Sequence, residues 1–261
     1  SEPIQDPSGN ITINGLTNIV VVGNDDKTEW TATGQVASNA AGMANYIISV
    51  KDLTGNVATP VTSTTSINLD TESPSLSDVV LSSSNTTNSS YAKAGDNLTL
   101  TFNASELIET PVVTLAGDNL SVQDTNSGAG TSWQATYTVQ DGDNGTVAFS
   151  IQYQDEAGNT GAPVTTTTDQ SSVNVDTTTP TLTLVKLKSN NSDNISLAKF
   201  GDTVTLEFDA SESLVNPSVR INGIESTVSF GSDTDWMATY NVQDYRAKVS
   251  TIAGAVGNRG S

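Results

Sequence analysis

Carboxylates are the side chains of this sequence with the most distinctive chemistry. The chain has 29 Asp and Glu residues against 10 Lys and Arg, with no histidine and no cysteine. This excludes nucleophiles based on His or Cys, disulfides and ordinary zinc sites. Carboxylate oxygens suit calcium, which takes about 6–8 oxygen ligands in irregular geometry. The sequence therefore predicts Ca²⁺ as the possible bound cofactor and no other cofactor.

The candidate calcium ligands form two groups, each near a junction between the repeats described below. For the first junction we expect Asp70, Glu72, Glu106 and Asp155, with Glu156 beside them. For the second junction we expect Asp96, Asp141, Asp143, Asp176, Asp209 and Glu212. The alternative is solvated loops, since Asp and Asn are common in turns where they bond their own backbone. The stretch "DGDNG" at 141–145 resembles the start of a calcium loop but lacks the distal Glu of an EF-hand.

A paired-carboxylate hydrolase is the enzymatic alternative. The obvious glutamates, Glu2, Glu106 and Glu212, recur at one equivalent position in every repeat. A catalytic pair would instead be unique to one domain. Because glycine-rich phosphate loops are absent as well, we expect no catalytic residues and no enzyme activity.

The elements that would position these acids belong to an internal repeat. "WQATYTVQDGDNG" from Trp133 has echoes in "WTATGQV" from Trp30 and "WMATYNVQD" from Trp236, at a spacing of 103 residues. "AGDNLTLTFNASE" at 94–106 matches "FGDTVTLEFDASE" at 200–212, and "NLDTESP" matches "NVDTTTP". Such self-similarity is typical of domain arrays. It predicts three domains: a first repeat at 1–70 that lacks its first two strands, a complete second repeat at 71–176, and a third repeat at 177–261 that is incomplete or divergent at its end.

Within each repeat the apolar residues alternate as in strands. Leu98, Leu100 and Phe102 alternate with polar residues, which indicates a half-buried strand. In the second repeat we expect one strand after residue 74 and others at 97–102, 111–117, 119–124, 133–139, 146–154 and 171–176. Sustained helical spacing is absent. The fold class predicted is all-β, with tandem immunoglobulin-like β-sandwiches in a linear array and the repeated tryptophan as a core anchor.

This topology explains why the acids should converge. In such a sandwich the loops after the second and sixth strands share one pole, where the first strand enters. The other acidic loops share the opposite pole, where the last strand leaves. Carboxylates at facing poles would meet at a junction, and calcium there would neutralise their repulsion and stiffen the joint.

Four phrases together carry a family resemblance: "DTTTPTLTLVKLKSNN", "FGDTVTLEFDASESLVNPSVRING", "WQATYTVQDGDNG" and "FSIQYQDEAGNTG". Nearly all of residues 1–243 resembles the Ig-like repeat domains of very large prokaryotic cell-surface proteins, including archaeal S-layer proteins and bacterial adhesins. The resemblance implies an exported stalk or lattice module, often with bound calcium. It implies copies of itself or the rest of a longer repeat protein as partners, and it does not separate a surface-layer subunit from an adhesin spacer.

Charge and sequons fit an extracellular, cell-surface location. The net charge of −19 argues against nucleic acid and anionic membranes as partners and favours metal cations. No apolar run is long enough to span a bilayer, and no signal-peptide pattern opens the sequence. Asparagines in Asn-x-Ser/Thr sequons are candidate glycan carriers, namely Asn10, Asn85, Asn88, Asn97, Asn103, Asn119, Asn144, Asn190 and Asn194.

The two ends of the sequence match incomplete repeats. The chain begins at the loop after the second expected strand, and the tail at 245–261 keeps a Gly-Asn pair but loses the aromatic pattern of the sixth strand. We therefore expect a segment of a longer array, with a divergent tail.

Overall fold

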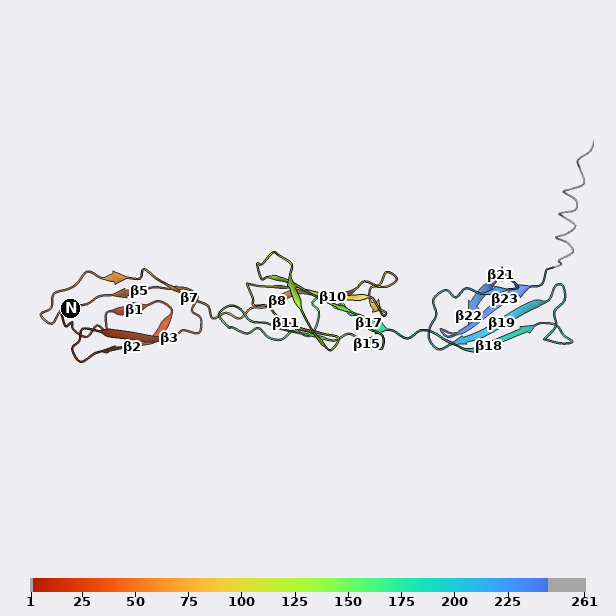
Figure 1. Cartoon of the computed structure of the whole chain (residues 1–261), viewed down its shortest axis with the longest axis horizontal. Coiled ribbons are helices and arrows are strands. Elements are labelled where there is room, and N and C mark those ends of the chain that lie inside the picture. Colours follow the sequence, from red (N-terminus) through yellow and green to blue (C-terminus); the bar gives the residue numbers. More distant parts are fainter. Residues whose placement is uncertain (1, 244–261) are drawn as a thin grey trace, which may run out of the picture. The chain divides into compact units, whose positions relative to one another are not determined.

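A computed structural model of the protein describes residues 2–243 (Figure 1). Within these residues the regular structure consists of strands and contains no helix, which confirms the all-β class. The chain divides into two compact units, Ser1–Thr177 and Thr178–Ser261. The predicted boundary between residues 70 and 71 stays a prediction. The divergent tail at 245–261 lies outside the described residues.

The first repeat forms three small antiparallel sheets. The first contains β1 (Ile11–Ile13), β5 (Tyr46–Ile48) and β6 (Val61–Thr62), in that order. The second pairs β2 (Leu16–Gly23) with β3 (Trp30–Val36). The third pairs β4 (Gly42–Ala44) with β7 (Ile67–Leu69). The edge of β3 that faces away from β2 has no strand beside it among the described residues.

The second repeat has a larger sheet of order β13-β14-β10-β8. Its strands are β8 (Leu76–Ser83), β10 (Asn97–Ala104), β13 (Val122–Asp124) and β14 (Ser132–Thr138). A second sheet has the order β12-β11-β16, formed by β11 (Val112–Leu115), β12 (Asp118–Leu120) and β16 (Phe149–Gln152). A third joins β15 (Asn144–Thr146), β17 (Asn174–Asp176) and β9 (Tyr91–Ala92), and its β17–β9 pair is parallel.

Unit 2 has one sheet of order β18-β19-β23-β22 and one short hairpin. The sheet contains β18 (Leu182–Ser189), β19 (Thr203–Ala210), β22 (Thr227–Phe230) and β23 (Asp235–Asn241). The hairpin pairs β20 (Arg220–Ile221) with β21 (Ile224–Glu225).

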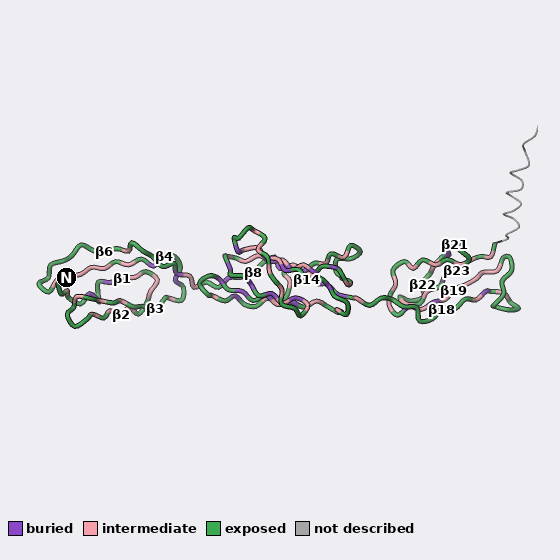
Figure 2. The backbone as a smooth tube through the Cα atoms, in the orientation of Figure 1, coloured by how far each residue is buried: buried purple, intermediate pink, exposed green. Residues whose placement is uncertain are grey.

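The hydrophobic core is concentrated in the second repeat. Leu98, Leu100 and Phe102 are at most 1% exposed, which confirms the alternation expected for their strand. They pack in a cluster with Trp133 and Ile151. Figure 2 shows buried backbone gathered around β8 and β14, whereas unit 2 is mostly exposed or intermediate.

The repeated tryptophans are not equally buried, so the expectation of one anchored indole per repeat is wrong for two of them. Trp133 is 6% exposed, and its Nε1 donates to the Gly130 carbonyl at 3.2 Å. Trp30 donates to the Lys27 carbonyl at the same distance, but Trp30 and Trp236 are only half-buried. The difference follows from their surroundings: among residues 2–243, the second repeat alone has both a four-stranded and an opposing three-stranded sheet.

Candidate metal centre

Three predicted ligands lie together at the ends of strands. Asp70 directly follows β7, Glu106 follows β10 by two residues, and Asp155 lies just past β16, where it bridges to Ile108. One carboxylate oxygen from each of Asp70, Glu106 and Asp155 lies within 4.8 Å of the other two. In the described part of the chain, no other group of three Asp or Glu side chains meets this criterion.

The Asp155 carboxylate is held by its own loop. It is 2% exposed and accepts from the Asn159 backbone N at 2.8 Å and from Asn159 Nδ2 at 2.7 Å. Burial by itself would raise the pKa of Asp155, but the hydrogen bonds from Asn159, together with those from the backbone of Ala157 and Gly158, lower the pKa. The folded loop therefore favours the ionised form of Asp155.

Asn159 also joins this loop to the first repeat. Its Nδ2 donates to the Asp70 carbonyl oxygen at 3.2 Å, in addition to the Asp155 carboxylate. The matching loop of the first repeat has the same construction: Asn56 donates to Asp52 through its backbone N at 2.8 Å and through its Nδ2. The side-chain bond from Asn56 is the main reason that the pKa of Asp52 falls to about 2.

Charge repulsion is concentrated on Glu106. Desolvation raises its pKa, and the charges of Asp70, Asp155 and Glu72 raise it further. The ion pairs of the described residues are Lys93–Asp96, Lys188–Glu207 and Arg220–Glu225, so none of them supplies a cation to the three carboxylates. A bound cation would remove the repulsion.

The carboxylates open onto a hollow with a volume of about 420 Å³. Asn68, Leu107, Glu156 and Ala157 complete its lining. Three converging carboxylates and an open side suit a hard cation that keeps several waters, which is the ligand set calcium accepts. The residues present therefore fit calcium.

The other predicted ligands of the second repeat either accept hydrogen bonds within their own loops or lie outside the group of three carboxylates. Asp96, 8% exposed, accepts from the Lys93 backbone N at 2.9 Å and pairs with Lys93 Nζ at 3.3 Å. Asp143 accepts from Tyr137 Oη at 2.7 Å and the Gln140 backbone N at 2.8 Å. Asp141 is exposed, and Asp176 is an exposed residue of β17. Asp96 and Asp143 thus serve their own loops, as the turn alternative anticipates.

Asp209 and Glu212 lie in unit 2. Asp209 belongs to β19, opposite Asp235 of β23. Glu212 is half-buried, and its Oε1 is buried with no hydrogen-bond partner among the described residues. Their role as metal ligands stays a prediction.

Asn159 holds Asp155 and Asp70 together but is not among the predicted ligands, because it is not an acid. The sequence does contain a pattern that indicates this role: "QDEAGN" at 154–159 repeats "KDLTGN" at 51–56, with Asp and Asn at the same spacing. Gly55 and Gly158 in these phrases have φ angles of 95° and 89°, a left-handed turn that explains the shared glycine.

The nine candidate glycosylation asparagines differ in accessibility. Asn85 and Asn103 are half-buried, and their Nδ2 groups donate to Asp96 and Asp78 at 2.9 and 3.0 Å. The other seven are exposed: Asn10, Asn88, Asn97, Asn119, Asn144, Asn190 and Asn194. Because a glycan is attached through Nδ2, these seven are the better candidates.

The pH dependence of stability tests the hydrogen bond from Tyr137 to Asp143. The hydrogen bond to Asp143 is the largest cause that raises the pKa of Tyr137 to about 12, followed by burial. The unfolded chain loses this proton near pH 10 while the native chain keeps it, so stability from this group is complete below pH 10 and declines as the pH rises from 10 towards 12. We expect Tyr137→Phe to flatten this alkaline decline, as measured by urea unfolding between pH 8 and 11. An unchanged decline in Tyr137→Phe would assign it to other groups.

Comparison with known proteins adds a distant structural match. No protein-family model matches the chain, and no curated protein matches it. Among solved structures it is similar to one described as "Bacteroides ovatus mixed-linkage glucan utilization locus (MLGUL) SGBP-B in complex with mixed-linkage heptasaccharide", with 15% identity and a TM-score of 0.19. The match covers 95% of this chain, which spans 64% of that one. At this similarity the match carries no argument about function.

Within residues 2–243, no helix has the length and apolar character that spanning a bilayer requires.

Proposed function

We propose that this protein is a structural repeat segment of an extracellular surface-layer or filament protein of the Ig-like repeat family named above. The observation that carries the proposal is the acidic centre, in which Asp70, the last residue of the first repeat, meets Glu106 and Asp155 of the second. The internal repeat and the all-β fold support it, because both suit a mechanical element.

Calcium is the proposed ion of this centre. Asp70, Glu106 and Asp155 would supply three carboxylates, and water would complete the 6–8 or so oxygens that calcium takes. The ion would neutralise the charge that raises the pKa of Glu106 and would hold the end of the first repeat against two loops of the second. Calcium would thereby make the joint stiffer.

The charge of the chain gives the proposed coat its chemistry. A net charge of −19 on every copy would attract cations and repel anions, with a range of about 8 Å at physiological salt. Glycans on exposed sequons would add bulk without altering the strands. We propose no catalytic role, because the glutamates suited to a carboxylate pair recur in each repeat.

An adhesin spacer is the second candidate function, and the calcium centre suits it equally, since a stiff joint would hold a distant binding domain away from the cell. Electron microscopy of the purified chain with calcium separates the two. A two-dimensional lattice or an ordered tube supports the surface layer or filament, and isolated extended rods support the spacer. Particles that look the same with calcium and with chelator would count against both.

Removal of one charge from the centre should stabilise the chain when calcium is absent. The folded-state pKa of Glu106 is raised, so the native chain holds this proton longer than the unfolded chain and loses stability as the pH rises above 4.5. Glu106→Gln removes the charge and with it this loss of stability. We expect a higher melting midpoint in chelator at pH 7, by about 2–4 °C for each kcal/mol regained, and little difference from wild type at pH 4.

The matched control is Glu29→Gln, because Glu29 is an exposed glutamate of the first repeat. This variant should melt as wild type does at both pH values. A lower midpoint for Glu106→Gln in chelator would contradict the assignment of repulsion to Glu106.

A further inference from the structure

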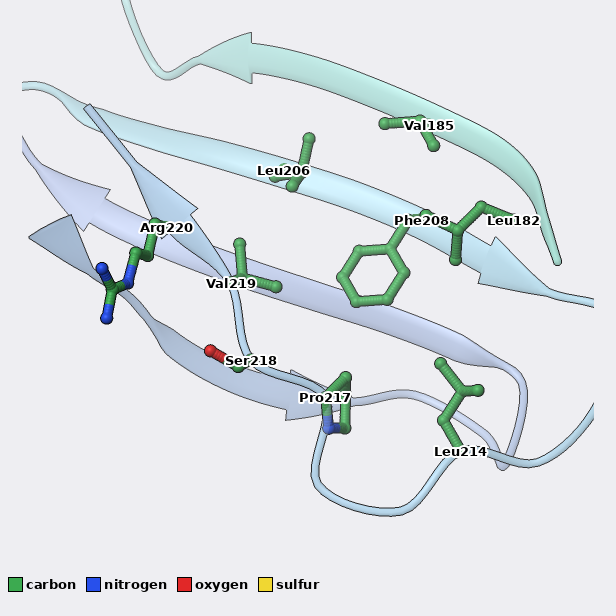
Figure 3. Close-up of a pocket in the computed structure, with 9 residues that line it drawn as sticks. All are labelled: Leu182, Val185, Leu206, Phe208, Leu214, Pro217, Ser218, Val219 and Arg220. Carbon is green, nitrogen blue, oxygen red and sulfur yellow. The ribbon is translucent and has the colours of Figure 1, made fainter. Parts of the chain in front are cut away.

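The hollow beside the three carboxylates differs from an apolar hollow in unit 2. The unit 2 hollow has a volume of about 330 Å³ and lies between Leu182 and Phe208 of the sheet and the segment of Pro217 and Arg220 beside it (Figure 3). Arg220 is the only charged residue among those that line it, and it pairs with Glu225 at 3.1 Å. That hollow offers no carboxylate to a cation, so cation binding depends on the acidic hollow and on what holds its parts together.

The linker that starts after Asp70 is attached to the first repeat by Thr71. The hydroxyl oxygen Oγ1 of Thr71 lies 3.1 Å from the carbonyl oxygen of Ser38 and 3.2 Å from that of Ala40, and both are positioned to accept its hydrogen bond. Ser38 and Ala40 belong to the segment between β3 and β4. One hydroxyl group therefore ties the start of the linker to its own repeat.

The same linker is attached to the second repeat by a pair of serines. The backbone N of Ser75 donates to Ser105 Oγ at 3.0 Å, and the backbone N of Ser105 donates to the Ser75 carbonyl oxygen at 2.9 Å. Residues 72–74 alone separate this pair from Thr71, and Pro74 among them is buried and has a fixed φ. The linker therefore has few conformations even without an ion.

Asn159 adds a direct connection between the two repeats. Through Nδ2, its half-buried side chain donates to the Asp70 carbonyl oxygen at 3.2 Å and to Asp155 Oδ2 at 2.7 Å. The amide NH₂ has two hydrogens, so it satisfies both acceptors at once. Asp70 also accepts the Glu72 backbone N at its Oδ1, at 3.1 Å, which orients its carboxylate. None of these bonds involves an ion, so they arrange Asp70 and Asp155 before an ion binds.

We propose that Asn159 and Thr71 form a clasp that restricts motion between the first and second repeats when no ion is bound. Thr71 holds the Asp70 segment to the first repeat, and Asn159 holds it to the loop of the second repeat that contains Asp155. Both are positioning residues, because neither supplies a carboxylate. The clasp also keeps Asp70 and Asp155 in place for calcium, and this second role rests on the calcium centre proposed above.

Distances between two spin labels test the clasp in chelator. The chain has no cysteine, so labels attach only where cysteine is introduced. Thr12→Cys in β1 and Thr136→Cys in β14 change exposed residues, one in each repeat. Double electron–electron resonance on the full chain then gives the distribution of distances between the repeats. We expect Asn159→Ala to broaden it and to raise the population of open joints about three- to tenfold, the effect of losing one hydrogen bond.

Asn56→Ala is the matched control for Asn159→Ala. Asn56 donates to Asp52 as Asn159 donates to Asp155, but the second acceptor of its Nδ2 is Thr54 of its own loop. Both variants keep the bond from the backbone N. We expect the two variants to lower the melting midpoint by similar amounts, because each weakens one loop. Asn56→Ala should leave the distance distribution unchanged.

Thr71→Val tests the other half of the clasp, with Thr177→Val as its control. Valine has the shape of threonine without the hydroxyl group. Thr177 follows Asp176 as Thr71 follows Asp70, and its Oγ1 donates to the Asp143 carbonyl oxygen at 3.0 Å. We expect Thr71→Val to broaden the distribution in chelator. Thr177→Val should leave it unchanged, because that bond lies at the other end of the second repeat.

Calcium titration of the same variants tests the positioning role. Isothermal titration calorimetry should show calcium binding to Asn159→Ala about tenfold or more weaker than to wild type, the usual cost of changing a residue that orients metal ligands. Asn56→Ala should bind calcium as wild type does. Calcium should also narrow the distance distribution of the wild-type chain beyond its width in chelator.

The outcomes distinguish the clasp from the calcium centre. Equal distance distributions in chelator for wild type, Asn159→Ala and Thr71→Val would overturn the clasp, even if calcium binds to all three chains. Absence of calcium binding to the wild-type chain would overturn the calcium centre and with it the positioning role. The distances in chelator would still decide whether the clasp exists.

Discussion

Calcium should raise the melting midpoint of the chain, by about 5–10 °C when its concentration is 100-fold above the dissociation constant. The reason is that an ion bound only by the folded state adds RT ln(1 + [L]/Kd), or about 2.7 kcal/mol at that concentration. The folded state offers three clustered carboxylates from Asp70, Glu106 and Asp155. The unfolded chain spreads them over 86 residues of sequence.

Differential scanning calorimetry in calcium, magnesium and chelator measures this effect. Magnesium should act more weakly, because it demands octahedral geometry and gives up its waters reluctantly. Asp155→Asn should abolish the calcium shift, whereas Asp118→Asn, a change of an exposed acid in β12, should preserve it. An unchanged midpoint in chelator would eliminate the calcium centre.

Truncation of one leucine should cost much more stability in the second repeat than at the matching position of the third. Leu81→Ala in β8 removes a side chain that is 3% exposed and should cost about 2–5 kcal/mol, from lost burial and the cavity left behind. Leu187→Ala in β18 changes the equivalent residue, which is 62% exposed, and should cost less than about 0.5 kcal/mol.

Hydrogen–deuterium exchange measured separately on β8–β10 and on β18–β19 tests this pair. It yields an opening free energy for each repeat, which one melting curve of a multidomain chain does not. Each wild-type repeat serves as the other's internal reference. Similar losses in the two variants would mean that Leu187 is covered in solution and would contradict its exposure in the structure.

Strand positions could be predicted because they depend on local alternation. Leu98, Leu100 and Phe102 are buried as the period of two requires, whatever else surrounds them. Turn chemistry is equally local, and "TGN" at 54–56 and "AGN" at 157–159 share the same Gly and Asn geometry. The all-β class could therefore be predicted from the sequence.

The acidic centre was predicted only in part. The repeat register brought Asp70, Glu106 and Asp155 to strand ends, and the structure places them together. Asp96 and Asp143 are loop acids of the same kind, but their carboxylate oxygens accept hydrogen bonds from Lys93 and Tyr137. Sequence spacing does not reveal which carboxylates have hydrogen-bond partners, because those partners are chosen by the three-dimensional path of each loop.

The sequence by itself determined the repeat, the strand class, the carboxylate-only chemistry and the matched positions of the tryptophans. Only the tertiary structure decided that Trp133 is buried while Trp30 and Trp236 are half-buried, and that Val79 is covered while Val185 is open. The physical reason is that alternation specifies which face of a strand turns inward. Burial of that face also requires an opposing layer, which long-range packing supplies in the second repeat.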